Sequence, residues 1–559
     1  MKIRSSKNLS IIAIISILAL SFFFFFRVDL TSDKRFSIST HSKRLMEKAT
    51  DQIDIVIYLD GDLNPGFLRL KKSTVELLEE LSVYAEKPFN IRFENPSLAE
   101  SQELRNANYT KMVDDGMTPT IIYERDKEGK SIEKVIFPWV KITHKNKSVA
   151  VSILKNIRGN SGEENLNISI ENLEFEITDG IRQLLNTEVT KIAFIEGHGE
   201  LSEAETFDIS KSLSRYFQID RGVLGLNPSI LNDYKVVIIA KPTQPFSESD
   251  KYIIDQYIMN GGTVLWLLDQ VRLSTQSLSK SGLSPALALD LNLNDMLFKY
   301  GVRINPVILQ DVQSVQVPIN IAPSNSTPQF EPTPWYYGPL LLTSSFHAVS
   351  RNITEVRAEF CSSIDIVGEN NNVKAQLLLA TSDNTHIIGT PTTIDLSVTP
   401  KANDKTYFNL AYIPVAVALE GNFESVFTNR LLPKELTNTS VFKEKSYKTR
   451  QIIIADGDII RNDTNKLADD GTTIPLGFDR YMNQQFGNKD FILNSVLYLA
   501  DNDGRMELRN RTLKLRLLNK QISTSEKAYW QWINIVSPLM LLLIFGIIYQ
   551  VIRKRKYTK

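Results

Sequence analysis

Residues 191–200, Lys-Ile-Ala-Phe-Ile-Glu-Gly-His-Gly-Glu, decide the fold class. A short continuous apolar run that ends in a glycine turn is typical of a strand buried on both faces. Two runs of the same kind follow at 235–240 and 262–269, and helical segments at 202–216 and 247–260 separate the runs. Strands that alternate with helices predict an α/β domain with a doubly wound parallel sheet.

This domain is the second and larger of two, and we expect it to cover residues 165–500. A glutamate-rich helix at 165–186 is expected to lead into it. A Pro-rich insertion near 305–340 is expected to be irregular and to face a partner, since long loops are usually functional. Three sheet-like segments should close the sheet or build a small annex to it, at 373–380, 413–420 and 451–455.

A smaller α/β domain is expected at residues 45–147, before the larger one. Its helix shows apolar residues at helical spacing, and its strands are short runs of apolar residues. The expected elements are strands at 52–59, 90–94, 120–123 and 135–140 and a helix at 73–84.

Two long apolar segments lie near the chain ends. Residues 9–26 contain only three serines as polar members, and at 1.5 Å per residue they span about 27 Å, close to a hydrocarbon core. This segment ends in Phe22 to Phe26 and then Arg27, which does not suit a signal-peptide cleavage site. Residues 533–552 form the second segment, with Pro538 expected in its first turn. We therefore expect two transmembrane helices.

The charges that flank these segments predict the orientation. Basic residues at 1–8 and in the tail 553–559 should keep both termini in the cytoplasm, with the body outside. Residues 501–530 are expected to form a basic juxtamembrane helix on the outer side. Long domains translocate largely regardless of charge, so this basic stretch does not overturn the orientation.

Composition argues against several kinds of chemistry. The chain has 64 lysines and arginines and 64 aspartates and glutamates, so its net charge predicts no nucleic-acid partner. The single cysteine, Cys361, excludes an internal disulfide and a cysteine-based metal cluster. The five histidines are scattered, and neither a phosphate-binding Gly-Lys-Ser/Thr loop nor a G-x-S-x-G string occurs. We predict no catalytic residue, no metal and no cofactor.

The best candidate site is the turn formed by Glu196, Gly197, His198, Gly199 and Glu200. It follows a strand of the expected parallel sheet, and open α/β sheets bind ligands at the carboxyl ends of their strands. The glycines let the backbone approach closely, and the histidine and carboxylates could hold a ligand. A purely structural turn is favoured, contact with a ligand or partner is the alternative, and catalysis is the weakest reading.

A second acidic turn, Asp456-Gly457-Asp458, follows the apolar segment at 451–455. It is similar to a cation-binding turn but lacks the later acidic ligands of a calcium loop. A structural turn is again favoured, with an ion site as the alternative.

Ordered strings along nearly the whole chain carry a family resemblance. They are Arg27-Val-Asp-Leu-Thr31, Arg35-Phe-Ser-Ile-Ser39, Tyr58-Leu-Asp-Gly-Asp62, Phe93-Glu-Asn-Pro-Ser97, Glu196-Gly-His-Gly-Glu200, Ala418-Leu-Glu-Gly-Asn-Phe-Glu-Ser425, Ala455-Asp-Gly-Asp458, Pro475-Leu-Gly-Phe-Asp479, Asn488-Lys-Asp-Phe-Ile-Leu-Asn494 and Leu515-Arg-Leu-Leu518. With these strings the chain resembles the GldG family, the gliding-motility-associated ABC transporter auxiliary proteins of Bacteroidetes.

The resemblance implies a non-catalytic accessory subunit in the bacterial cytoplasmic (inner) membrane, with its body in the periplasm. Its implied partners are a multi-span permease and a separate ATPase subunit, in gliding motility or secretion. The second domain also looks like the class I glutamine amidotransferase-like sheet of ciliary transport proteins, but the catalytic cysteine of that family has no counterpart here. The alternatives are a periplasmic solute receptor for a small ligand, a residual hydrolase or amidotransferase-like enzyme, and a scaffold that transmits force.

Overall fold

The computed structural model describes residues 38–557, with gaps at 100, 126–130, 158–159, 186–188, 323–325, 368–371, 398–399, 437–441, 464–472, 502–503, 505, 507 and 509–524. The chain divides into a body, residues 36–511, and a second unit made of residues 1–35 and 512–559. The expected transmembrane helix at 9–26 lies outside the described residues, as does most of the expected basic helix at 501–530.

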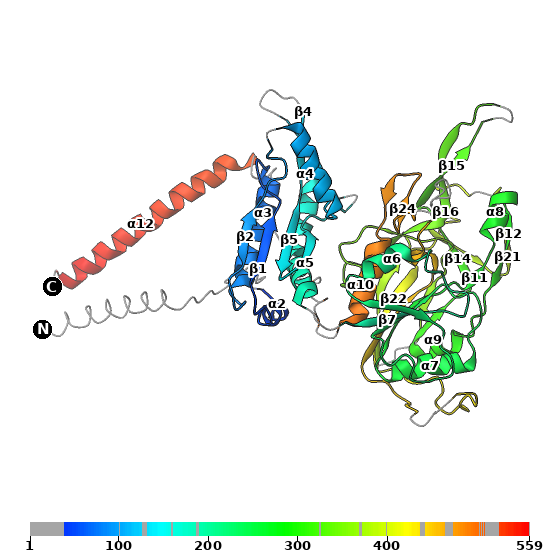
Figure 1. Ribbon diagram of the computed structural model, residues 1–559. Coiled ribbons are helices and arrows are strands. Elements are labelled where there is room, and N and C mark those ends of the chain that lie inside the picture. Colours follow the sequence, from blue (N-terminus) through cyan, green and yellow to red (C-terminus); the bar gives the residue numbers. More distant parts are fainter. Residues whose placement is uncertain are drawn as a thin grey trace. The chain divides into compact units, whose positions relative to one another are not determined.

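The N-terminal part of the body is built on a sheet of four strands in the order β2-β1-β5-β6 (Figure 1). Strand β1 pairs in parallel with β2 and antiparallel with β5, and β5 pairs antiparallel with β6. The strands β3 and β4 form a separate hairpin. The elements are α2 (Thr40–Met46), β1 (Ile53–Ile57), α3 (Pro65–Ser82), β2 (Asn90–Phe93), α4 (Gln102–Asp114), β3 (Thr120–Arg125), β4 (Ser131–Ile136), β5 (Trp139–His144), β6 (Lys147–Ser152) and α5 (Gly162–Leu185).

Helix α3 begins eight residues before the start expected from its apolar spacing, because its first turn is capped. The Asn64 side chain accepts hydrogen bonds from the backbone N–H groups of Gly66 and Phe67, and Pro65 occupies the first helical position. Both features stabilise a helix start without contributing to the apolar pattern.

Helix α5 packs against the N-terminal sheet. Its apolar face contributes Leu166, Leu173, Ile177 and Ile181 to the same hydrophobic core as the strands of that sheet. The core of the N-terminal part therefore extends beyond β6 to the end of α5, although the sequence assigns this helix to the second domain.

The C-terminal part contains a larger sheet in the order β15-β16-β19-β22-β23-β10-β9-β7-β8, with β17 on β16. The strands β8, β7, β9, β10 and β23 are parallel neighbours, as the sequence predicts. The expected sheet-like segments form β19, β22 and β23 of this same sheet. The elements of this half are β7 (Lys191–Ile195), α6 (Phe207–Leu213), β8 (Gln218–Gly222), β9 (Val236–Ala240), α7 (Glu248–Met259), β10 (Thr263–Leu267), β22 (Pro414–Gly421), β23 (Thr449–Ile454) and α10 (Asn488–Ala500).

The prediction of a parallel sheet is wrong for the half of this sheet that runs from β23 to β15. The pairs β23 with β22, β22 with β19, β19 with β16 and β16 with β15 are all antiparallel, so the sheet is mixed. A continuous apolar run shows that a strand is covered on both faces but not which way its neighbour runs, and β22 is buried almost throughout. These strands are β15 (Ser314–Asn320), β16 (Phe330–Thr343), β17 (Val356–Arg357) and β19 (Val373–Ala380).

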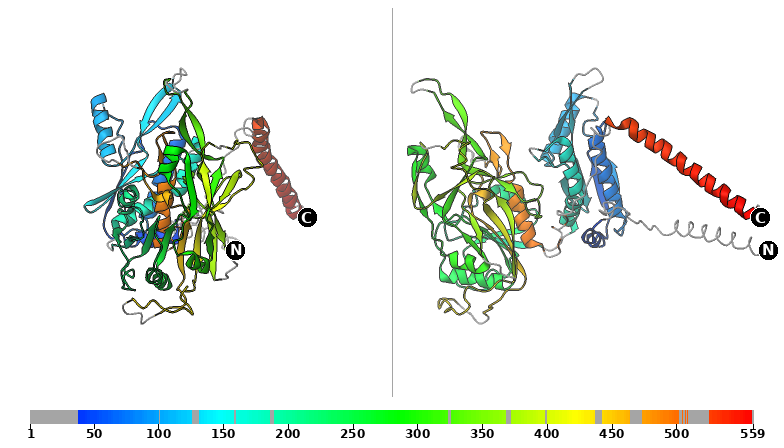
Figure 2. Two further views of the ribbon diagram at one scale, coloured as in Figure 1. Left: turned by 90° about the vertical axis from the view of Figure 1, so that its right-hand side faces the viewer. Right: turned by 180° about the vertical axis from the view of Figure 1, so that it is seen from behind.

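The Pro-rich insertion is largely β-structure, contrary to expectation. Strands β15 and β16 form a ribbon that extends beyond the rest of the sheet in both views of Figure 2. Pro318 lies directly opposite Pro332 in this ribbon. Strand β15 is an edge strand, and the outer part of β16 pairs with β15 alone, so these prolines occupy positions where a missing N–H costs little.

Short elements surround the large sheet. Helix α10 packs on strands β9, β10 and β23 and also contacts α6, whereas α7 packs on β10. The remaining elements are β11 (Val271–Arg272), α8 (Thr275–Ser281), β12 (Leu283–Ala288), α9 (Asn294–Tyr300), β13 (Val302–Ile304), β14 (Val307–Asp311), β18 (Ile364–Ile366), β20 (Thr385–Gly389), β21 (Thr392–Asp395), η1 (Asp458–Ile460), β24 (Phe478–Asp479) and β25 (Gln484–Gln485).

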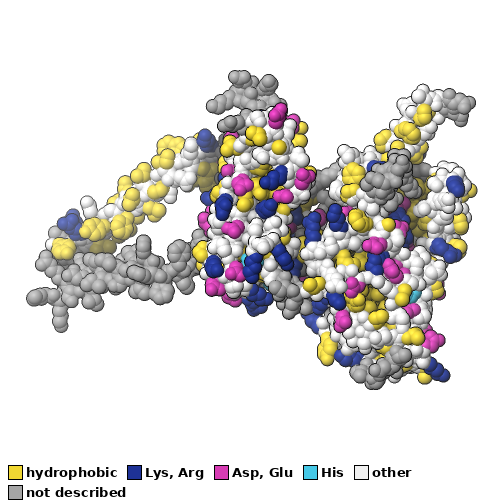
Figure 3. All heavy atoms as spheres, viewed as in Figure 1, with side chains coloured by type: hydrophobic (Ala, Val, Ile, Leu, Met, Phe, Trp, Pro, Cys, Tyr) yellow, Lys and Arg dark blue, Asp and Glu magenta, His cyan; other side chains and the backbone are white. Residues whose placement is uncertain are grey.

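The C-terminal helix α12 (Lys527–Tyr557) contains a candidate membrane span, Lys527–Arg555. Its apolar side chains are not buried against other described residues, and Figure 3 shows them along its surface. The sequence predicts Pro538 in the first turn, but the helix begins earlier and Pro538 lies inside it. The carbonyl of Asn534 therefore has no i+4 N–H donor. Every described core residue lies between Ile38 and Met506, so the body has its own hydrophobic cores.

Candidate functional site

The carboxyl ends of four neighbouring parallel strands bring polar residues to one edge of the large sheet. Glu196 follows β7, Lys241 follows β9, Asp269 follows β10 by one residue, and Asp456 follows β23 by one residue. Because these strands are parallel and adjacent, the residues that follow them meet at the same edge. Two groups of side chains result: the turn at 196–200 and a carboxylate cluster.

In the turn, the His198 ring is held on three sides. Its Nδ1 lies 3.0 Å from Glu200 Oε1, and its Nε2 lies 3.3 Å from Asp250 Oδ2. The ring stacks on Phe246 with 3.7 Å between the centroids. The imidazole is buried, and each of its nitrogens lies within hydrogen-bond distance of a protein carboxylate.

Charge fixes the protonation of this histidine. Burial alone would lower the pKa of His198, but the hydrogen bonds that its ring donates to the carboxylates of Asp250 and Glu200, with the charges of these groups, outweigh burial and raise the pKa to about 9. Burial likewise works against ionised Asp250, yet its hydrogen bond with His198 holds its pKa below the usual value. At neutral pH His198 is therefore an imidazolium between two carboxylates, which is a poor metal ligand and a poor general base.

Gly199 is required by the close approach of the loop after β9. It has a φ of +71°, and a Cβ at this position would lie 2.2 Å from Thr243 Oγ1. The carbonyl of His198 accepts hydrogen bonds from the backbone N–H groups of Thr243 and Gln244, both at 2.8 Å. The two loops are thus joined backbone to backbone, which a side chain at 199 would prevent.

Glu196 is the most open acidic group of the turn, with 43% of its side chain exposed. Its Oε1 accepts a hydrogen bond of 2.7 Å from Arg221 Nε. The same guanidinium donates to Thr206 Oγ1 and to the carbonyl of Leu201. Arg221 therefore anchors the turn to the following segment and leaves part of the Glu196 carboxylate facing solvent.

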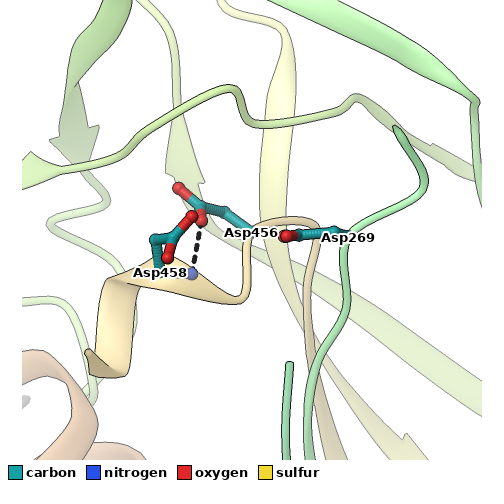
Figure 4. Close-up of side chains that lie close together, drawn as sticks. All are labelled: Asp269, Asp456 and Asp458. Carbon is teal, nitrogen blue, oxygen red and sulfur yellow. Dashed lines mark hydrogen bonds between the residues drawn. The ribbon is translucent and has the colours of Figure 1, made fainter. Parts of the chain in front are cut away.

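The carboxylate cluster consists of Asp269, Asp456 and Asp458, and one carboxylate oxygen of each lies within 4.8 Å of the other two (Figure 4). Asp456 is fully buried, and its carboxylate accepts hydrogen bonds from the backbone N–H groups of Asp458 at 2.7 Å and Glu359 at 2.8 Å. Asp269 accepts one from Gly457 N at 2.6 Å. The carboxylates thereby fasten the end of β23 to two other segments.

Lys241 supplies the cation at the centre of this cluster. Its Nζ lies 3.1 Å from Asp269 Oδ2 and donates a hydrogen bond to Asp458. Arg461 Nη1 lies 2.8 Å from the other oxygen of Asp458. Lys241 also has a φ of +55°, a strained conformation for a residue with a side chain. A Cβ on Gly457 would lie 2.5 Å from that of Lys241, so glycine is needed there.

The ion pairs and the burial of this network shift the pKa values of its members. Burial raises the pKa of Asp456 well above its usual range, and the neighbouring Asp458 and Asp269 raise it further. Burial also raises the pKa of Asp269, although Lys241 opposes this. Burial lowers the pKa of Lys241, but Asp269 and Asp458 outweigh it and the net shift is upward. A divalent cation could reach all three carboxylates only if the Lys241 ammonium moved away.

A polar cleft of about 240 Å³ adjoins the cluster and includes Arg357, Glu359, Arg461 and Asp463 in its lining. These four charges form two pairs: Arg461 Nη2 lies 3.5 Å from Glu359 Oε2, and Arg357 Nη1 lies 3.8 Å from Asp463 Oδ2. Cys361 is fully buried, and burial raises its pKa far above the ordinary value. Its thiol is therefore a poor nucleophile.

The sequence places the turn at 196–200 and the acidic turn at 456–458 correctly at strand ends. It does not reveal that Asp269 and Lys241 join the second turn, although each follows a buried apolar run, which is the available signal. Glu359 and Arg461 come from irregular segments, and only the tertiary fold brings them to this edge.

These features define a mixed α/β body with a candidate membrane helix at its carboxyl end and no assembled catalytic set among the described residues at the sheet edge. The model of a family of transport-system auxiliary proteins, described as "ABC-type uncharacterized transport system", matches residues 190–495, more than half of the chain. The chain belongs to this family. A domain of unknown function, DUF7088, matches residues 32–143.

Two individual proteins are similar to parts of the chain. An uncharacterized protein of Borreliella burgdorferi is 24% identical over 292 residues, which are 51% of this chain and 52% of that protein. The chain thus matches about half the length of this curated relative. The solved structure of the mmIFT52 N-terminal domain is 14% identical and covers 56% of this chain and 99% of its own, with a TM-score of 0.31. At that TM-score the likeness carries no argument about the fold.

Proposed function

We propose that this protein is a membrane-anchored, non-catalytic accessory subunit whose body works on the periplasmic side of an ABC-type transport complex. The single observation that carries the proposal is the family match over residues 190–495 in a chain that ends in a long apolar helix. The proposed partners are a multi-span permease and a separate ATPase subunit. The sequence has no phosphate-binding loop of its own, so the energy for transport must come from such a partner.

The composition of α12 supports the anchoring step. Its apolar stretch is preceded by Tyr529, Trp530 and Trp532 and followed by Arg553, Lys554 and Arg555. Aromatic residues favour the membrane interface, and positive residues favour the cytoplasmic side. We propose that α12 crosses the inner membrane with its end in the cytoplasm. The apolar residues 9–26 would form the second span, which brings both termini to that side.

The place of the complex in gliding motility or secretion is proposed from the strings that the chain shares with the GldG family. The strings at 58–62, 196–200 and 455–458 directly follow the strands β1, β7 and β23. The class I glutamine amidotransferase-like fold of the large sheet is likewise a proposal from resemblance. The catalytic cysteine of that family has no counterpart in this sequence, which favours a non-catalytic role.

Within this function, we assign partner contact at the turn to Glu196. The side chains of His198 and Glu200 contact each other, whereas part of the Glu196 carboxylate is exposed. A solute receptor centred on His198 has correspondingly little support. Glu196→Gln should weaken recovery of partners and leave the fold intact, and Glu203→Gln, an exposed glutamate nearby, is the matched control.

Purification of the tagged full-length chain from membranes in mild detergent tests the main proposal. A multi-span permease and an ATPase should be recovered with it in constant ratio. Protease added to spheroplasts should digest the body while the tail after residue 553 stays protected. A protein that is recovered alone in every detergent, or a body protected in spheroplasts, would contradict the proposal.

A further inference from the structure

A cavity of about 800 Å³ lies in the C-terminal part and includes in its lining Gln270, the residue after Asp269 of the ion-pair network. It is lined by α9, the turn before that helix, the strand β13, Pro306 and the segment at 425–430. Its volume falls within the range of about 300–1,000 Å³ that is typical of small-molecule sites. No role in the preceding sections accounts for it.

One wall of the cavity contains a buried polar group with no partner. Gln270 follows Asp269 beyond the end of β10, and only 2% of its surface is exposed. Its Nε2 forms no hydrogen bond with any group among the described residues, and neither does the buried Oγ1 of Thr428, which lies in the same lining. A buried donor without an acceptor is costly, so its retention needs an explanation.

The rest of the wall is mainly apolar. Leu289, Leu297, Ile304 and Val426 line the cavity, and Phe298 lies at its rim with 55% of its surface exposed. A cavity with apolar walls and few polar groups selects a ligand by an apolar body and a small number of directed hydrogen bonds.

The charges on the wall leave one cation available. Lys299 is paired with Glu424 at 2.9 Å, and Arg430 is paired with Asp295 at 2.6 Å. Asp290 accepts a hydrogen bond from the backbone of Asn292. The charged residues of the lining are Asp290, Asp295, Lys299, Arg303 and Arg430.

Arg303 has no ion pair within 4.0 Å among the described residues, and its side chain is exposed. Asp365 lies opposite it across the β13–β18 pair, but the carboxylate of Asp365 accepts a hydrogen bond from Asn305. An arginine guanidinium at an apolar cavity suits a carboxylate, which it can bind through two parallel hydrogen bonds.

We propose that this cavity binds a small carboxylate with an apolar body and a hydrogen-bond acceptor, the chemistry of an N-acyl amino acid. Arg303 binds the carboxylate, and the wall formed by Leu289, Leu297 and Val426 covers the apolar part. Gln270 Nε2 is shielded from solvent in the free chain, so its side chain turns toward the cavity to donate to the acceptor of the ligand. The inference goes beyond the accessory role and does not depend on the identity of the membrane partners.

The test uses the full chain in lipid nanodiscs and isothermal titration calorimetry with two probes, N-acetyl-phenylalanine and its neutral amide. The acid should bind with a Kd below about 1 mM and about tenfold more tightly than the amide, because only the acid pairs with Arg303. Arg303→Gln should abolish that tenfold preference. Gln270→Met should weaken both probes by about tenfold.

Arg272→Gln, which removes an exposed arginine outside the cavity, is the matched control and should bind as the native chain does. The melting temperature of each variant shows whether it is folded. The proposal is overturned if neither probe binds, if acid and amide bind equally, or if Arg303→Gln keeps the preference for the acid. None of these outcomes affects the recovery of membrane partners, so the ligand proposal can fail while the accessory-subunit proposal stands.

Discussion

Replacing Lys241 by methionine tests whether the strand-end network is closed by this lysine. The substitution keeps the length of the side chain and removes the ammonium between Asp269 and Asp458. Both carboxylates then stay buried without their cation. We expect the body, residues 36–511, to fold with a reduced free energy of unfolding.

The magnitude follows from the burial of the pair. Removing one partner of a buried ion pair typically costs about 3–5 kcal/mol. The Lys241 side chain retains 19% exposure, so we expect the lower end of that range, about 3 kcal/mol at pH 8.

The loss should depend on pH in a defined direction. Burial already raises the pKa of Asp269, and without Lys241 the main opposing group that remains is the Gly457 N–H, which donates a hydrogen bond to this carboxylate. A carboxyl whose pKa is raised in the folded state binds protons more tightly there, so lower pH favours folding. The deficit should shrink as pH falls from 8 toward 5, by up to about 1.4 kcal/mol per unit where one proton is taken up.

Urea unfolding followed by tryptophan fluorescence measures the effect, since Trp266 is fully buried in β10 next to the network. Combining Lys241→Met with Asp269→Asn should restore part of the loss, because the uncompensated charge is gone. Lys299→Met, which breaks the exposed pair with Glu424, should change stability by less than about 1 kcal/mol. A Lys241→Met body as stable as the native one at pH 8, or a double variant no better than the single, would refute the reasoning.

Three further outcomes are expected. The pKa of His198 is raised from 6.5 to about 9 in the folded chain, so its contribution to the free energy of unfolding, about 3 kcal/mol, is full below pH 6.5 and lost as pH rises through 9. His198→Gln should therefore flatten the dependence of the free energy of unfolding on pH across that window, as urea unfolding can measure. Gly199→Ala should destabilise by about 2–3 kcal/mol through the contact with Thr243, whereas Gly116→Ala, with positive φ but open space, should cost only about 1 kcal/mol, as unfolding midpoints can show. Gln270→Met should raise the free energy of unfolding by about 1 kcal/mol, because it removes a buried donor that has no acceptor, and a lower midpoint would contradict this.

The sequence predicts the local elements well wherever one signal dominates. The runs at 191–195, 236–240 and 263–267 are apolar throughout and bounded by turns, and all three are strands of the large sheet. Strand direction is a different matter, because β22 and β23 are equally apolar and yet pair antiparallel. Periodicity reports burial, and direction is set by the connections between strands.

The predictions for the Pro-rich insertion and for the candidate site are incomplete for related reasons. Prolines usually exclude a strand, but at Pro318 and Pro332 only one side of the ribbon needs hydrogen bonds. At the sheet edge, the sequence locates both turns. It does not predict that Lys241 and Asp269 contact the second turn, because they are distant from residues 456–458 in the chain. Tertiary contacts of this kind leave no periodic trace.

The two polar regions beyond β10 differ in what they leave unsatisfied, and that difference indicates where a ligand can act. At the sheet edge, where open α/β proteins usually bind ligands, Lys241 and Arg461 neutralise the carboxylates, so a ligand there would have to displace a protein charge. One residue further along, Gln270 keeps a buried donor without an acceptor beside an apolar cavity. A ligand gains most where it supplies a hydrogen bond that the folded chain lacks, since it then removes an existing penalty as well as adding a contact. The same chain can therefore have a closed strand-end network that stiffens the body and, next to it, the cavity that we propose as a ligand site.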